Sequence, residues 1–297
     1  MPTIRQLRYF DAVARHGHFG RAAESCAISQ PALSMQIKGM EAELGTPLFE
    51  RLHDGARLTR TGALVATRAA TILTDMQELA DAARQDAKPL SGVLNLGVIP
   101  SIAPYLLPPL LPKLRRDYPD LQLNIRESQT DNIVEELVDG TLDLLLLALP
   151  IDHTRIETLP LFNDPFVLAV PTDFDKGKSL RVPSELIREE RLLLLEEGHC
   201  FRDQALAYCE LRKAGKIDTY GASTLATVVQ MVANGMGVTF LPEMAVPVES
   251  RNPGIQLMRL EAPEPHREIG LCWRRSSPRR EEFEAFGNVV TGARGAL

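Results

Sequence analysis

Two cysteines in the segment GHCFRDQALAYC are the residues of this sequence best suited to chemistry. Cys200 and Cys209 lie nine positions apart in a chain that has four cysteines. The residues between them have a helical pattern, and such a helix would separate the thiols by about 13.5 Å along its axis and turn them to opposite faces. A disulfide needs Cα atoms within about 7 Å of each other. Helix and disulfide therefore exclude each other, and joining these thiols would change the fold of the segment.

The surroundings of the first thiol favour reactivity. Cys200 follows Gly198 and His199 at the predicted helix start, where backbone N–H groups favour a thiolate, and Arg202 is close in sequence. Two other interpretations remain open. His199 and the two cysteines could bind a metal, although this set lacks a fourth ligand, or Cys200 and Cys209 could be inert core residues.

Composition predicts where these thiols would work. The chain has 297 residues, 44% hydrophobic and 24% charged, which is typical of a soluble globular protein with two or three domains. No secretory signal is apparent, and the densest apolar run, LDLLLLALP, is too short for a membrane span. We therefore expect a cytoplasmic protein without a membrane partner, with reduced thiols. Cys26 and Cys272 lie in apolar patterns typical of small core residues.

The N-terminal residues have the pattern of a helix-turn-helix. LRYFDAVARHG predicts a first helix that ends at Gly17, and FGRAAESCAI predicts a short second one. The third, SQPALSMQIKGMEAELG, begins at Ser29 as the N-cap and ends at Gly45. Residues 1–68 hold nine basic and six acidic residues within a chain of net charge −6, so this part is expected to bind a polyanion. A protein-interaction module of three helices is the alternative.

A hairpin and a long helix are predicted next. The basic segment PLFERLHDGARLTRTG predicts a β-hairpin that turns at Asp54 and Gly55, the geometry of a wing. No proline or glycine interrupts the residues from Gly62 to Pro89, which predicts one long linker helix.

The segment from LRYFDAVARHG through SQPALS to ELGTPLFERL resembles the winged DNA-binding domain of LysR-type transcriptional regulators. The resemblance implies promoter DNA and RNA polymerase as partners, a dimer formed through the linker helix, and pairing of dimers into a tetramer. It also implies that the third helix enters the major groove and that the wing touches the DNA backbone. Many relatives carry arginine where this chain has Met35, which offers a base only apolar contact. By position, the implied DNA contacts are Gln30, Pro31, Ser34, Met35, Lys38 and Arg51.

The rest of the chain alternates predicted strands and helices, which indicates an α/β fold with parallel sheets. Two such sets and a late return through REIGLCWRR predict two lobes resembling a periplasmic binding protein. Ser101 and Thr130 follow predicted strands, where ligands bind in open α/β sheets, although both could instead be helix caps. The expected domains are the winged helix-turn-helix at 1–61, the linker helix at 62–89, and a regulatory domain at 90–297. Its lobe I would hold about 90–163 and 269–297, and its lobe II about 164–268.

GHCFRDQALAYC also resembles the redox segment of the peroxide-sensing LysR-type regulators, and the likeness extends through IAPYLLP, STLATVVQMVANGMGVTFLPEMAVP and EPHREIGL. The resemblance implies that hydrogen peroxide oxidises Cys200 and that Cys209 resolves the product to a disulfide, which switches the protein to activate antioxidant genes. Serine stands at 101 where these relatives have threonine, which would hold peroxide more loosely. The implied peroxide pocket is Ser101, Thr130, His199, Asp203 and Arg267.

Three functions remain in competition at this point. The first is the peroxide-responsive regulator, and the second is a LysR-type regulator that binds a small metabolite and has incidental cysteines. The third is a thiol peroxidase or solute-binding protein with an added DNA-binding domain. No cofactor motif or reductant-docking site is visible, and one peroxide would be consumed per disulfide, so we expect signalling and not an enzyme.

Overall fold

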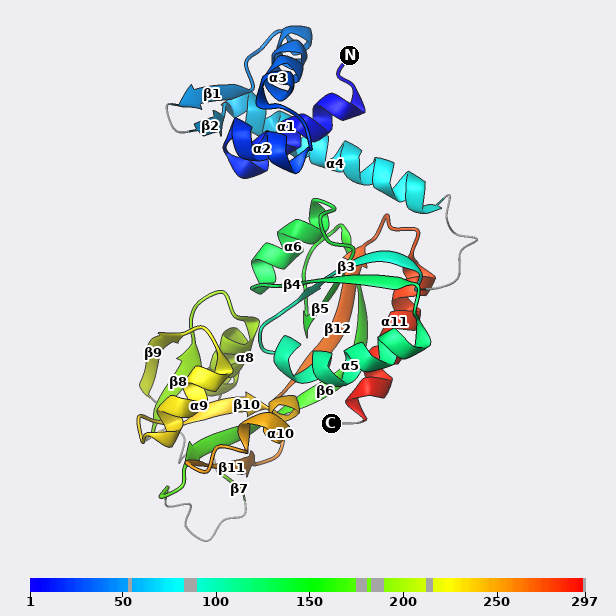
Figure 1. Ribbon diagram of the computed structural model, residues 1–297. Helices are drawn as coiled ribbons and strands as arrows, with labels where there is room; N and C mark the ends of the chain where they lie inside the picture. The colour runs from blue at the N-terminus through cyan, green and yellow to red at the C-terminus, as the bar shows by residue number, and fades with distance from the viewer. Residues whose placement is uncertain (53–54, 83–89, 175–180, 183–189, 212–215, 296–297) are drawn as a thin grey trace. The chain divides into compact units, whose positions relative to one another are not determined.

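The structure is a computed structural model that describes residues 1–52, 55–82, 90–174, 181–182, 190–211 and 216–295 (Figure 1). It divides into two compact units, Met1–Asp86 and Ala87–Leu297, each with its own hydrophobic core. Among the helices described, none combines the length and the apolar character that a membrane span requires.

The N-terminal unit is a helix-turn-helix followed by a two-stranded wing, as predicted. Phe10, Val13, Leu33 and Ile37 are fully buried where its first three helices meet. Its elements are α1 (Ile4–His16), α2 (Phe19–Ser25), α3 (Gln30–Leu44), the antiparallel strands β1 (Phe49–Leu52) and β2 (Gly55–Leu58), and α4 (Arg60–Ala82).

Local sequence signals set the ends of these helices. Gly17 and Gly45 end α1 and α3 in the left-handed conformation, with φ of 60° and 68°. The Ser29 side chain accepts a hydrogen bond from the backbone N–H of Ala32 and so caps α3, with Pro31 in its first turn. The predicted turn residue Asp54 and the predicted end of the linker helix at Pro89 lie outside the described residues.

In the second unit, lobe I is a sheet with helices on both faces. Strand β3 (Gly92–Val98) lies between β4 (Leu121–Glu127) and β5 (Leu144–Leu149), all three parallel. Because the chain moves from β3 to β4 and then back past β3 to β5, right-handed crossovers put the two connecting helices on opposite faces. These are α5 (Ala103–Asp117) and α6 (Thr130–Val138), and the C-terminal α11 (Arg280–Arg294) lies beside α5 (Figure 1).

Lobe II is built on the far half of one long strand, β6 (Ile156–Pro171). There, β10 (Thr239–Pro242) and β11 (Ile255–Leu260) pair with it on opposite edges. The remaining elements are β7 (Arg181–Val182), β8 (Arg191–Leu195), α8 (Cys200–Leu211), β9 (Lys216–Ala222), α9 (Leu225–Ala233), η1 (Glu243–Ala245) and α10 (Val246–Glu249).

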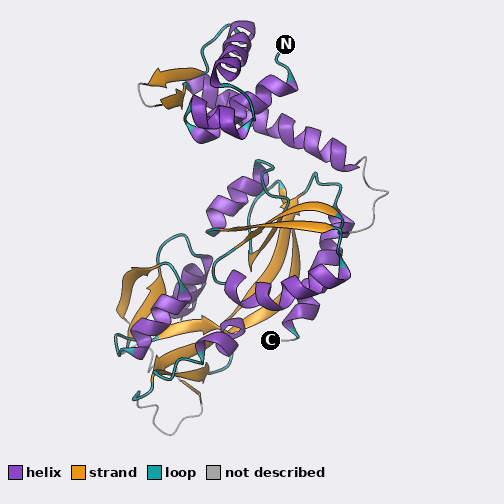
Figure 2. Ribbon diagram, viewed as in Figure 1, coloured by secondary structure: helices purple, strands orange, loops and turns teal. Residues whose placement is uncertain are grey.

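The prediction of parallel sheets was only partly right, because the sheet that joins the lobes is mixed (Figure 2). Strand β12 (His266–Arg274) runs antiparallel to β5 and to β6, and β6 runs antiparallel to β10 and β11. The sheet is mixed because the chain crosses between the lobes twice. Strand β6 leaves lobe I, and β12 returns to it in the opposite direction beside β6. The expected lobe boundaries at 163/164 and 268/269 fall inside these two strands.

Candidate functional site

Both cysteines of the redox segment lie in one helix. Cys200 is the first residue of α8 and is a half-buried free thiol, and Cys209 stands two residues before the helix ends at Leu211. The nine-residue spacing corresponds to about 13.5 Å along a helix axis, well beyond the reach of a disulfide. The Cys209 side chain lies outside the described residues, so its predicted burial is not tested. The helical backbone keeps the two positions apart, as predicted.

An aromatic contact fixes the start of α8. Phe201, which follows Cys200, is buried and packs edge-on against Phe166 of β6, with ring centroids 5.1 Å apart. The guanidinium of Arg267 lies over the Phe201 ring, with its Cζ 5.3 Å from the ring centroid. The residue next to the thiol thus contacts both an aromatic ring of β6 and a cation from β12.

Arg267 is fully buried, and each of its nitrogens has a partner. Nε donates to Asp164 Oδ2 at 2.9 Å and Nη1 donates to Ser101 Oγ at 2.7 Å. Nη2 donates to the Ser101 carbonyl at 3.0 Å and contacts Met244 Sδ at 3.5 Å. Arg267 therefore connects four elements: the β3–α5 turn, β6, η1 and the start of α8.

Asp164 supplies the countercharge for Arg267. The two residues face each other as register partners of β6 and β12, and the Asp164 side chain is only 2% exposed. Its second oxygen, Oδ1, accepts the backbone N–H of Met244 at 3.0 Å. Sequence reasoning missed Asp164, because a single acidic residue gives no sign of a partner 103 residues away.

Ser101 and Thr130 lie where predicted, just beyond the carboxyl ends of the adjacent strands β3 and β4. The alternative that they are helix caps is wrong. Ile102 and Gln129 occupy the N-cap positions of α5 and α6, and neither side chain caps its helix with a hydrogen bond. The Thr130 hydroxyl is buried and has no hydrogen-bond partner among the described residues. An unpaired buried hydroxyl is costly, and it is available to a polar ligand.

The loop before α8 rests on lobe I. Gln129 Nε2 donates to the Glu197 carbonyl at 3.2 Å, and Gly198 adopts a φ of +90° against the same side chain. His199 follows and is buried, and this burial lowers the pKa of its imidazole below the usual value, although Glu196, 4.0 Å away, acts in the opposite direction. We infer a neutral imidazole at pH 7.

The predicted pocket residues come from three elements and the loops beside them. Arg267 contacts both Ser101 and Phe201, the residue after Cys200. Gln129, the neighbour of Thr130, contacts the loop that holds His199. Asp203 is exposed in the first turn of α8, three residues after Cys200. Within the part of the chain that the structure describes, no cluster of three His, Cys, Asp or Glu side chains could hold a metal ion.

Of the other two cysteines, Cys272 differs from Cys200 in burial and Cys26 does not. Cys272 is fully buried in β12, and burial raises the pKa of its thiol to about 12, so it carries no thiolate at neutral pH. Cys26 was expected inside the second helix, but it is the C-cap residue of α2 and is only half-buried.

The predicted DNA contacts lie in the first nine residues of α3 and in the wing strand β1. Gln30, Pro31 and Lys38 are exposed, Met35 is 68% exposed, and Ser34 is half-buried. Arg51 belongs to β1, and its side chain lies outside the described residues. An exposed apolar side chain as large as Met35 on this helix fits a surface that a partner covers.

A second buried contact between the lobes was also missed. Tyr105 of α5 donates a hydrogen bond from its hydroxyl to Glu249 Oε1 of α10, at 2.8 Å, and both side chains are buried. Burial, followed by this hydrogen bond, raises the pKa of the Tyr105 phenol far above its usual value. The phenol is therefore a permanent donor to the carboxylate.

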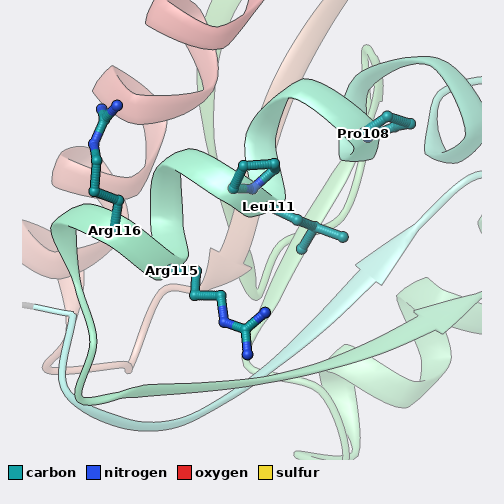
Figure 3. A pocket seen from close by; sticks show the side chains of 5 residues that line it. Pro108, Leu111, Arg115 and Arg116 are labelled. Carbon is teal, nitrogen blue, oxygen red and sulfur yellow. The ribbon is translucent and has the colours of Figure 1, made fainter.

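A surface hollow on α5 is separate from this site. It is lined by exposed residues of the middle and C-terminal part of the helix, whereas Ser101 precedes its N-terminal end (Figure 3). The lining residues are Pro108, Leu111, Pro112, Arg115 and Arg116.

Two protein-family models match this chain. Residues 4–63 match the model of the bacterial regulatory helix-turn-helix proteins of the lysR family, and residues 87–294 match the LysR substrate binding domain. The chain belongs to the LysR family of bacterial regulators. Among curated members, it is 39% identical over 288 residues to the DNA-binding transcriptional dual regulator OxyR of Escherichia coli K12, covering 97% of this chain and 94% of that protein.

Solved LysR-family structures agree over the full length of this regulator. Full-length OxyR from Pseudomonas aeruginosa, with a Cys-to-Asp substitution, superposes with a TM-score of 0.81 at 38% identity, covering 97% of this chain and 94% of that one. A cysteine variant of Corynebacterium glutamicum OxyR, described as H2O2-bound, gives a TM-score of 0.68 at 33% identity, covering 99% and 92%. Within the LysR family, the chain thus groups with the OxyR proteins.

Proposed function

We propose that this LysR-type regulator senses hydrogen peroxide through Cys200. The observation that carries the proposal is the position of Cys200 at the first residue of α8, with a second cysteine in the same helix. The buried Arg267 contacts Phe201 at that helix start and donates to the buried Ser101 hydroxyl. The unpaired Thr130 hydroxyl follows Gln129, which contacts the loop before the helix. These groups can hold a small molecule that both donates and accepts hydrogen bonds, as peroxide does.

The chemistry has two balanced steps. The Cys200 thiolate attacks one peroxide oxygen, an S–O bond forms, the O–O bond breaks, and hydroxide leaves to take up a proton and become water. The Cys200 sulfur is thereby oxidised to a sulfenic acid. The Cys209 thiolate then attacks that sulfur, so that an S–S bond forms and the sulfenic oxygen leaves as water after protonation.

The second step requires α8 to unwind, because its geometry holds the thiols farther apart than a disulfide allows. Unwinding removes Phe201 and Ala205 from the core, where both are buried. It also releases the contact of Phe201 with Arg267, and Arg267 is joined to Ser101 in lobe I. Disulfide formation at Cys200 would therefore change contacts in both lobes.

The output of the switch is transcription. Promoter DNA is bound by the start of α3 and by the wing, through Gln30, Pro31, Ser34, Met35, Lys38 and Arg51. The protein acts in the cytoplasm as a dimer or tetramer, and its oxidised form activates antioxidant genes together with RNA polymerase. Like OxyR of Escherichia coli, it is a regulator and not an enzyme.

Two measurements on one sample test the proposal. The reduced protein is treated with one equivalent of hydrogen peroxide, the thiols are mapped by mass spectrometry, and the same samples are footprinted on a candidate promoter. We expect a Cys200–Cys209 disulfide and a changed footprint. A metabolite-responsive regulator would instead keep both thiols and an unchanged footprint, and a thiol peroxidase would consume many equivalents of peroxide when a reductant is supplied.

A further inference from the structure

The carboxylate of Asp164 is bonded on both oxygens to groups from other elements. Oδ2 accepts Arg267 Nε from β12, and Oδ1 accepts the Met244 backbone N–H from η1. The side chains of Asp164 and Arg267 are 2% and 0% exposed, so water cannot replace either partner. A buried arginine needs such a countercharge, because leaving it unpaired is strongly unfavourable.

Asp164 also sets the direction in which Arg267 points. A guanidinium is planar and rigid, so fixing Nε fixes the directions of both terminal nitrogens. These nitrogens donate to the side-chain and main-chain oxygens of Ser101, at 2.7 and 3.0 Å. The Ser101 hydroxyl is thus held from two sides by one side chain.

The same contacts determine whether the Ser101 hydroxyl donates or accepts in its bond with Arg267. Arginine has only donors, so Ser101 Oγ must be the acceptor in its bond with Nη1. Its own proton is then left to donate elsewhere. A hydroxyl that must donate is what a peroxide oxygen needs as the O–O bond breaks, since negative charge develops on the leaving oxygen.

We propose that Asp164 is a positioning residue for the oxidation of Cys200: by holding Arg267, it turns the Ser101 hydroxyl into an oriented donor toward peroxide. The proposal rests on the proposed function, and it concerns a residue that touches neither the thiol nor the oxidant. The same contacts restrict the Ser101 side chain, which lacks the methyl group that restricts threonine. Arg267 therefore compensates for the looser hold on peroxide expected of serine at this position.

The test is a double-mutant cycle on the reduced full-length protein, using Asp164→Asn and Ser101→Ala. In Asp164→Asn, the amide NH2 must face either Arg267 Nε or the Met244 N–H, so one of the two hydrogen bonds is lost in either orientation. The rate of Cys200 oxidation by hydrogen peroxide is followed by alkylation quench and mass spectrometry. We expect each substitution to slow oxidation by about threefold to tenfold, and the double variant to be no slower than the slower single one.

Two controls separate positioning from general damage. Asp143 is a matched buried carboxylate, 3.6 Å from Arg279 and 3.9 Å from Arg274, that also accepts a backbone N–H, from Asn95. Asp143→Asn should leave the oxidation rate unchanged. Alkylation of Cys200 by iodoacetamide needs no donor from Ser101, so Asp164→Asn should leave that rate unchanged as well.

Each outcome decides the matter. If Asp164→Asn reacts with peroxide at the wild-type rate, if the losses of the cycle multiply, or if alkylation slows equally, Asp164 has no positioning role. Should Asp164→Asn fail to fold, the same cycle is run with Arg267→Lys. Lysine keeps the charge but loses the two hydrogen bonds that the planar guanidinium donates to Ser101. A wild-type Cys200 that hydrogen peroxide does not oxidise would overturn the proposed function itself, whatever the variants do.

Discussion

Gln129 and Gly198 lie in direct contact between lobe I and the loop that leads into α8. A Cβ built on Gly198 would lie 2.6 Å from Gln129 Oε1, and Gly198 has a φ of +90°. The Gln129 amide also donates to the carbonyl of Glu197. Both the backbone conformation and the available space therefore require glycine at this point, two residues before Cys200.

Gly198→Ala should therefore disturb the site as well as the stability. The positive φ alone costs an alanine roughly 1–2 kcal/mol, and the methyl group must also displace Gln129. We expect a lower free energy of unfolding in urea and slower oxidation of Cys200 by peroxide. The matched control is Gly235→Ala, which has a φ of +71° but no atom within 4 Å of the added Cβ. If the two variants lose equal stability and both oxidise at the wild-type rate, the contact with Gln129 is unimportant.

The cysteines should divide into two classes. Cys200→Ser should abolish the peroxide response, because no thiolate remains to attack. Cys209→Ser should trap a sulfenic acid or a mixed disulfide on Cys200, visible as added mass after peroxide treatment. Cys26→Ser and Cys272→Ser serve as controls and should keep the full DNA-footprint change, the latter because its thiol is buried and protonated. An equal loss in either control would mean that the roles are assigned wrongly.

Much of this site was accessible from sequence because its signals are local. Ser29 and Gly45 fix the ends of α3, and the spacing of Cys200 and Cys209 within one helical pattern fixes their separation. Each of these depends on residues close together in the chain, for which capping and periodicity are sufficient.

The rest depends on pairings across the chain. The strand β6 contains Pro160 and Pro165, and proline is disfavoured inside a strand. Its continuity comes from pairing with β12 about a hundred positions later. The Asp164–Arg267 pair exists only because of that register, and Tyr105 meets Glu249 over a still longer separation. A single sequence contains no signal that joins such residues.

Tyr105→Phe should weaken the link between the lobes. The phenol is the donor to the buried Glu249 carboxylate, and its raised pKa keeps it protonated even at alkaline pH. Removing it leaves a buried acceptor unpaired, which should lower the free energy of unfolding by about 1–3 kcal/mol. Chemical denaturation of the reduced protein measures this loss. Glu249→Gln keeps an acceptor and should lose less, so a larger loss there would contradict the assignment of roles.

His199 should make stability fall on acidification. Burial lowers its pKa in the folded protein below the unfolded value of about 6.5, so the unfolded chain takes up the proton more readily. The contribution of neutral His199 is complete above pH 6.5 and is lost as the pH falls through the folded pKa. His199→Gln should flatten this part of the curve of unfolding free energy against pH. An unchanged slope in His199→Gln would mean that His199 titrates as it does in the unfolded chain.

DNA binding should separate charge from base recognition on α3. Lys38 is exposed and expected at a phosphate, so Lys38→Ala should weaken binding to all sequences alike and reduce the slope of log affinity against log salt by about 0.9. Gln30 is exposed at the first position of the helix and is expected at a base edge, so Gln30→Ala should keep the salt slope and lose discrimination between operator and unrelated DNA. Lys113→Ala, in the other unit, controls for the change in net charge and should alter neither quantity. Fluorescence anisotropy with operator and scrambled duplexes, at several salt concentrations, gives both readouts. If Gln30→Ala kept full operator preference, α3 would not be the helix that recognises bases.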